Sequence, residues 1–119
     1  MPGKAETPRF GDGATSDEAL LLCPRCGQGY LHHGRVRVLE RLYGEDGDGI
    51  AVAVRHLKVR MQPLEESELP GRRNAVEISF SCENCSEVLD GFAQAEDLVL
   101  QILQHKGNTF VSWVQVEQA

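Results

Sequence analysis

Two Cys-x-x-Cys units constrain the fold of this chain more than any other feature of its sequence. Cys23 and Cys26 form the first unit, and Cys82 and Cys85 form the second, with fifty-five residues between the units. Two thiolates three positions apart on a tight turn can occupy two corners of a tetrahedron at about 2.3 Å from a zinc ion. Together the two units therefore predict one four-cysteine site for Zn²⁺.

The cellular compartment decides whether such cysteines are interpreted as metal ligands or as disulfides. The sequence before Cys23 lacks the apolar core of a signal peptide, so we expect a cytoplasmic protein. Cytosolic thiols are kept reduced, which favours a metal over two disulfides or four unrelated buried cysteines. No apolar run approaches the roughly eighteen residues of a membrane helix, so we expect no membrane role.

His32 and His33, which follow the first unit closely, are the rival ligands. Either could replace a cysteine, but both lie beyond the turn and just before a predicted strand, where surface or packing roles are commoner. We therefore assign them no chemistry. A zinc ion held by four thiolates has no open position for water or substrate, so we expect a structural metal.

Signatures of zinc enzymes do not match this sequence. Zinc nucleobase deaminases carry His-x-Glu followed by Pro-Cys-x-x-Cys, whereas no histidine here precedes x-Glu and Cys23 follows Leu22. An HNH-type nuclease would combine histidines with Asn108, but Asn108 is predicted to lie in a turn. We therefore expect no enzymatic activity and no small-molecule substrate.

Length and composition bound the domain organisation. A chain of 119 residues, 41% hydrophobic and 25% charged, is typical of one soluble globular domain. Residues 1–18 are rich in Gly, Pro, Ser, Thr and charged residues, which predicts a disordered N-terminal tail. Residues 19–119 are predicted to form the single domain.

Period-two patterns in the first half of the domain predict β-strands. Residues 35–42 and 50–61 alternate apolar and polar side chains on either side of the flexible, acidic loop at 44–49, which predicts a hairpin. In the second stretch the larger apolar side chains fall at even-numbered positions as far as Val54 and at odd-numbered positions from Leu57 onward. We therefore expect a bulge near Arg55 and His56.

The second half continues the pattern. A predicted loop over residues 62–74 is followed by a strand over 75–82, whose apolar face also carries Cys82. Beyond the second cysteine unit, "DLVLQILQHKGNTFVSWVQVE" predicts a last hairpin that turns at Gly107 and Asn108 and places Ile102 opposite Trp113. A short helix over residues 94–104 is the alternative, because good helix formers recur there.

These elements define the expected fold class. It is a mainly β, antiparallel domain with a zinc-ribbon site of two knuckles and four cysteine ligands. The strands predicted between the two Cys-x-x-Cys units would bring these units together.

The net charge limits binding to nucleic acid. The formal charge is −6 with neutral thiols, and four thiolates around one Zn²⁺ add −2, which gives −8. Such acidity argues against a protein that surrounds nucleic acid with its whole surface. A local basic strand face is still predicted, formed by Arg35, Arg37, Arg41, Arg55, Lys58 and Arg60. The plainer interpretation is a solvated face balanced by Glu40, Glu77 and the acidic loop.

Several segments resemble a known group of proteins. They are "LLCPRCGQGYLHHGRVRV", "GRRNAVEISFSCENC" and "LQILQHKGNTFVSWV", in which C-P-x-C-G, L-H-H-G, R-R, C-E-x-C and Q-H-K-G-x-T-F follow in order. This pattern resembles small four-cysteine zinc-ribbon proteins encoded by phages, prophages and mobile elements of high-GC bacteria, over residues 21–114. The resemblance implies the four-cysteine site and an accessory protein that binds a bacterial component, and it implies no particular activity.

The sequence therefore predicts a small, zinc-binding, non-catalytic interaction protein of the phage or mobile-element type. Its expected partner is a bacterial protein. The alternative is a nucleic-acid-binding zinc ribbon that uses the basic strand face.

Overall fold

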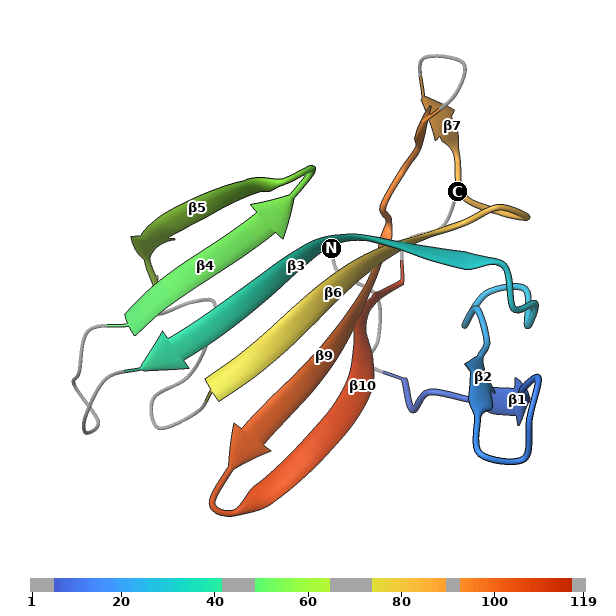
Figure 1. Ribbon diagram of the computed structural model, residues 1–119, viewed down its shortest axis with the longest axis horizontal. Helices are drawn as coiled ribbons and strands as arrows, with labels where there is room; N and C mark the ends of the chain where they lie inside the picture. Colours follow the sequence, from blue (N-terminus) through green and yellow to red (C-terminus); the bar gives the residue numbers. More distant parts are fainter. Residues whose placement is uncertain (1–5, 42–48, 65–73, 90–92, 117–119) are drawn as a thin grey trace.

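The main feature of the computed structural model is an antiparallel sheet of six strands (Figure 1). The structure describes residues 6–41, 49–64, 74–89 and 93–116. In spatial order the strands are β10 (Asn108–Val116), β9 (Leu98–His105), β6 (Asn74–Cys82), β3 (Leu31–Arg41), β4 (Gly49–Arg55) and β5 (Lys58–Pro63). Two small ribbons accompany it: β1 (Phe10–Asp12) with β2 (Ala19–Leu21), and β7 (Val88–Leu89) with β8 (Ala93–Gln94).

This architecture confirms the predicted mainly antiparallel β fold. The described residues contain no helix, and none therefore that could cross a membrane. Residues 98–105 form β9 in place of the alternative helix, because Leu98 and Leu100 recur with the period of a strand and are both buried beside β6.

The predicted hairpin between the first two long segments is confirmed, since Val38 in β3 pairs with Val52 in β4. The bulge expected near Arg55 and His56 is wrong. His56 and Leu57 instead form a two-residue turn, with φ angles of 50° and 64°. The apolar alternation changes its phase because this segment forms two strands, β4 and β5. The turn could not be recognised in the sequence because neither residue is Gly, Asn or Asp, the residues typical of such turns.

The last hairpin forms, but its predicted turn position is wrong. The turn lies at Lys106 and Gly107, with φ angles of 50° and 81°, and Trp113 pairs with Leu100 in place of Ile102. The observed pairing differs from the predicted one by two residues. Because side chains alternate with a period of two, this difference leaves the side chains of residues 108–113 on their predicted face, up to a bulge between Trp113 and Gln115.

The sheet buries a hydrophobic cluster on each face. One cluster lies beside the cysteines and includes Trp113, whose ring meets that of Phe80 edge to face at a centroid distance of 5.6 Å. The second cluster, on the opposite face, consists of Leu39, Ala51 and Ala75 with their partly buried neighbours. The first cluster contains more buried residues than the second, so the larger part of the hydrophobic core lies at the cysteine end.

Part of the N-terminal segment for which the sequence predicts a disordered tail pairs with the rest of the chain. β1 pairs with β2, and Glu6 exchanges two backbone hydrogen bonds with Trp113, at 3.0 and 2.7 Å. These bonds attach the segment to the outer side of β10. The division into a tail and a domain stays a prediction, and the expected loops at 44–49 and 62–74 fall largely outside the described residues.

Candidate metal centre

The four cysteines lie at one end of the sheet, where β3 and β6 meet. Cys23 and Cys26 lie in the turn between β2 and β3, Cys82 ends β6, and Cys85 lies in the turn that follows. The pairing of Leu31 with Cys82 brings the two turns together across fifty-five residues of sequence. The pairing of β3 with β6 therefore accounts for the long gap.

The four Sγ atoms form a compact cluster. They lie within 4.8 Å of one another, and the Cys23–Cys85 and Cys26–Cys82 pairs are both separated by 3.6 Å. A tetrahedral zinc site with bonds of about 2.3 Å requires sulfur atoms about 3.8 Å apart, whereas a disulfide requires about 2.05 Å. All four cysteines are free thiols. The cluster could therefore hold one metal ion, as the Cys-x-x-Cys spacing predicts.

The first turn contains a glycine in a left-handed conformation. Gly27 adopts a φ of 77°, a conformation that a residue with a Cβ rarely adopts. The Gly27 N–H donates to the Cys23 carbonyl at 2.9 Å, and the Cys23 N–H donates to the Gln28 carbonyl at 2.8 Å. This glycine therefore allows the turn to fold around the sulfur cluster.

The second turn replaces glycine by Ser86. The Ser86 N–H donates to the Cys82 carbonyl at 2.9 Å, which repeats the turn of the first unit. The Ser86 hydroxyl accepts a hydrogen bond from the Cys82 N–H at 2.7 Å and donates to Asp97 Oδ1 at 2.8 Å. Ser86 is thus a polar link between the second turn and Asp97, the residue before β9.

A buried ion pair supports both turns, and the sequence interpretation missed it. Arg25 donates two hydrogen bonds to the carboxylate of Asp97, both at 2.9 Å, and a third to the Ser86 hydroxyl at 3.0 Å. Each side chain of the pair is only 9% exposed. Bidentate pairs of this kind are stronger than single neutral hydrogen bonds and also fix the relative orientation of the two side chains. The network therefore joins the first turn, the second turn and the start of β9.

The protonation of the thiols depends on burial and on their neighbours. Burial raises the pKa of Cys82 and of Cys85, and for Cys85 the adjacent Cys23 raises it further. Burial would also raise the pKa of Cys26, but hydrogen bonds from the Gln28 backbone and the Asn84 side chain lower it to about 6. Thiolates are the ligand form of cysteine, so Cys26 is the most readily available ligand of these three.

Arg25 is a cation that interacts with the cluster. Burial would lower its pKa, but the hydrogen bonds and the charge of Asp97 raise it. The Arg25 charge also acts to lower the pKa of Cys85. A fixed positive charge beside four sulfurs therefore offsets part of the negative charge of a four-cysteine site.

Neither rival histidine belongs to the cluster. His32 pairs with Glu83 at 2.8 Å on the surface, and His33 lies in β3 opposite Phe80. The group of potential ligands that the structure brings together consists of the four cysteines alone among the described residues.

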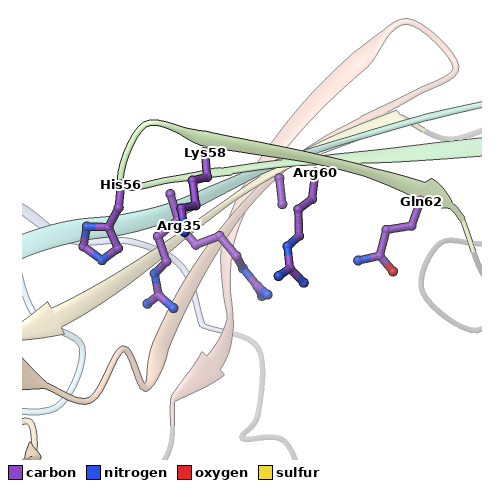
Figure 2. Close-up of a pocket in the computed structure, with 7 residues that line it drawn as sticks. Arg35, His56, Lys58, Arg60 and Gln62 are labelled. Atoms are coloured by element: carbon purple, nitrogen blue, oxygen red, sulfur yellow. The ribbon is translucent and has the colours of Figure 1, made fainter.

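The six basic residues of the predicted strand face separate into two groups. Arg37 pairs with Glu77 at 3.0 Å, and Arg41 lies six residues beyond Arg35 at the far end of β3. The other four line a cavity of about 360 Å³ on one face of β3, β4 and β5, here called the basic pocket (Figure 2): Arg35, Arg55, Lys58 and Arg60. His56 and Gln62 flank it, and the short side chain of Ala53 leaves the central space.

The Glu96 carboxylate contacts two residues of the basic pocket. Glu96 pairs with Arg55 and accepts a hydrogen bond from the Arg35 N–H at 3.1 Å. Gly34 permits this approach, because a Cβ at that position would overlap the Glu96 carboxylate. The side chains of Lys58 and Arg60 form no ion pair or hydrogen bond within the described part of the chain.

Comparison with known proteins does not extend these findings. No family model, curated protein or solved structure matches this chain.

Proposed function

We propose that this protein is a zinc-stabilised, non-catalytic binding domain whose ligand is a protein. The observation that carries the proposal is the contrast between its closed, buried cysteine cluster and an exposed apolar sheet face. Following the resemblance of the sequence to zinc ribbons of phages and mobile elements, the partner is a bacterial protein met in the cytoplasm.

Zinc is the proposed metal because of the donor set. Four thiolates select soft or borderline ions, and a tetrahedral arrangement of four sulfurs is typical of structural zinc. Cys23 and Cys82 are fully buried, and Cys26 and Cys85 are partly buried against the same hydrophobic cluster. The proposed ion has no free coordination position, and its role is to hold the two turns together.

Protein binding is proposed from the side of the sheet opposite the basic pocket. Six apolar residues lie there in two rows across three strands, Val36, Val54 and Val59 in one and Val38, Val52 and Met61 in the other, here called the apolar face. Val59 is 62% exposed and Met61 is 69% exposed. A contiguous exposed apolar patch rimmed by charges is typical of an interaction surface.

Nucleic-acid binding is the second candidate, supported by the gathering of four cations at the basic pocket. A basic strand face could follow a phosphate backbone. The proposal ranks it second because Glu96 and Glu77 each pair with one of the predicted contact residues, and because the whole chain has a charge of −6.

The test compares the two candidates on the zinc-loaded protein. Affinity capture from a bacterial lysate, followed by mass spectrometry, is expected to recover a defined protein complex that survives nuclease treatment. A titration with DNA and RNA oligonucleotides at several salt concentrations is expected to show no binding tighter than the millimolar range. Tight binding that falls steeply with salt, with nuclease-sensitive capture, would reject the protein partner in favour of nucleic acid.

A further inference from the structure

We infer that β5 receives an extended segment of the partner as a seventh strand of the sheet, and that this segment alternates acidic and apolar side chains. The inference rests on the proposed protein-binding function and adds the chemistry of the partner. It follows from three properties of β5: its outer edge, which is unpaired within the described part of the chain, its hydrogen-bonding register and its two different faces.

The two edges of the sheet differ in their coverage. On β10, the backbone of Trp113 exchanges two hydrogen bonds with Glu6, so a further segment of the chain already occupies part of that edge. On β5 all six residues are exposed, and within the described part of the chain the strand pairs only with β4. An uncovered edge strand is a template for strand addition.

The register of the β4–β5 hairpin shows which backbone groups point outward. The Leu64 N–H donates to the Gly49 carbonyl at 2.9 Å, so these two residues form a hydrogen-bonded pair. Such pairs recur at every second residue of the hairpin, and Arg60 opposite Ala53 is therefore also one of them. Residues of the other parity direct their N–H and C=O groups away from β4. They are Val59, Met61 and Pro63.

Pro63 has no N–H, so the outward donors of β5 belong to Val59 and Met61. Proline at this position ends the free edge without breaking the ladder to β4. The available edge is therefore about four residues long, between Lys58 and the proline. A partner segment of five to seven residues is enough to cover it.

The side chains of β5 specify what this segment carries. Figure 2 shows Lys58, Arg60 and Gln62 projecting to one side of the strand, toward the basic pocket, whereas Val59 and Met61 belong to the apolar face. Cross-strand neighbours on one face interact directly. Acidic side chains would therefore meet Lys58 and Arg60, and apolar side chains would meet Val59 and Met61.

The like charges in the hairpin also favour an acidic segment. Arg55 lies directly opposite Lys58, and like charges opposite each other destabilise a strand pair. Glu96 neutralises Arg55. A carboxylate from an added strand would neutralise Lys58 and remove the remaining repulsion.

Other occupants use less of this surface. A second copy pairing through β5 would place its own Lys58 and Arg60 against those of the first copy. Nucleic acid would use the basic pocket, but it would leave the apolar face and the outward N–H groups without partners. No Phe, Tyr or Trp side chain among the described residues lines the basic pocket to stack on a base. An alternating protein strand complements all three features.

The experiment uses the zinc-loaded full chain and synthetic heptapeptides with blocked ends. The probe is Glu-Val-Glu-Val-Glu-Val-Glu, and its matched control carries the same residues in the non-alternating order Glu-Glu-Val-Val-Val-Glu-Glu. Fluorescence anisotropy is expected to show at least about tenfold tighter binding of the alternating peptide, because a strand presents the alternating side chains on opposite faces. Equal affinities would overturn the inference.

Two variants separate strand addition from charge attraction. Met61→Pro removes an outward N–H, while Met61→Ala shortens the same side chain and keeps that N–H. The proline variant is expected to bind the alternating peptide at least about fivefold more weakly than the alanine variant. Arg60→Glu is expected to reverse the preference toward Lys-Val-Lys-Val-Lys-Val-Lys, and it tests the inference even where Met61→Pro unfolds. Unchanged preference in Arg60→Glu would overturn it.

Three further results distinguish a failure of this inference from a failure of the proposed protein-binding function. If Arg60→Glu and Met61→Pro still capture the same cellular protein as wild type with equal yield, the seventh strand is wrong and protein binding stands. If wild type captures no protein and binds oligonucleotides in competition with the alternating peptide, both proposals fail. Concentration-dependent dimers that Arg60→Glu strengthens would assign the β5 edge to a second copy.

Discussion

The two ends of the six-stranded sheet treat their polar and apolar groups in opposite ways. At the cysteine end, Arg25, Asp97 and Ser86 are buried or nearly so, and each forms several hydrogen bonds. At the β4–β5 end, Lys58 and Arg60 are exposed without a described ion-pair partner, and Met61 is 69% exposed. We therefore expect stability to be concentrated at the cysteine end of the sheet and open contact surface at the β4–β5 end.

The largest expected effect comes from removing one ligand at the stable end. Cys82→Ser is expected to abolish metal binding and cooperative unfolding, because structural zinc contributes an apparent ~10–16 kcal/mol, comparable to the whole stability of a small domain. Metal analysis and urea unfolding followed by tryptophan fluorescence of Trp113 would measure both. Val59→Ser is the matched control at the other end and should retain metal. A metal-free Cys82→Ser protein as stable as wild type would disprove the structural metal.

The next effect separates two ion pairs of the structure, Arg25–Asp97 and Arg55–Glu96. Asp97→Ala leaves the Arg25 charge buried without its carboxylate and is expected to lower the free energy of unfolding by about 3–5 kcal/mol. Glu96→Ala, the adjacent control, removes the carboxylate beside Arg55, a side chain that is 47% exposed, and should cost less than about 1 kcal/mol. Denaturant unfolding of both variants would check the order. Similar losses would contradict the contrast between the ends.

The sequence predicted the cysteine end well because its signals are local and chemical. Two Cys-x-x-Cys units have few other uses in a reduced compartment, and Gly27 marks its own left-handed turn. The Arg25–Asp97 pair could not be predicted, because seventy-two positions separate the two residues and neither stands out in composition. Such a pair is visible only once β3, β6 and β9 are in register.

At the β4–β5 end, the sequence predicted strands but not the number of strands. The turn at His56 and Leu57 carries neither glycine nor asparagine, so the parity change pointed to a bulge. The basic residues were predicted to share one strand face, yet Arg37 and Arg41 do not line the basic pocket with the other four. The reason is that tertiary register, and not spacing along one strand, decides which cations converge.

A smaller effect on the free energy of unfolding is expected from relieving the backbone strain in the β4–β5 turn. His56 and Leu57 both adopt positive φ angles, at 50° and 64°, which costs a residue with a Cβ about 1–2 kcal/mol. The double change His56→Asn and Leu57→Gly supplies the residues that such a turn favours, and it should raise the free energy of unfolding by about 1–2 kcal/mol. Thermal denaturation of the metal-loaded protein would measure it. A lower melting temperature would contradict the two-residue turn.

The smallest effect on stability is expected at the apolar face, where the contrast between the ends is sharpest. Val59 is 62% exposed and lies on an edge strand, so Val59→Ser should change the free energy of unfolding by less than about 0.5 kcal/mol. Leu98 is fully buried beside the cysteines, so Leu98→Ala should cost about 2–5 kcal/mol. Urea unfolding gives both values, and anisotropy with the alternating peptide gives the second readout. If the apolar face serves binding, Val59→Ser weakens the peptide complex while stability is unchanged, whereas a large loss of stability would show that Val59 supports the fold.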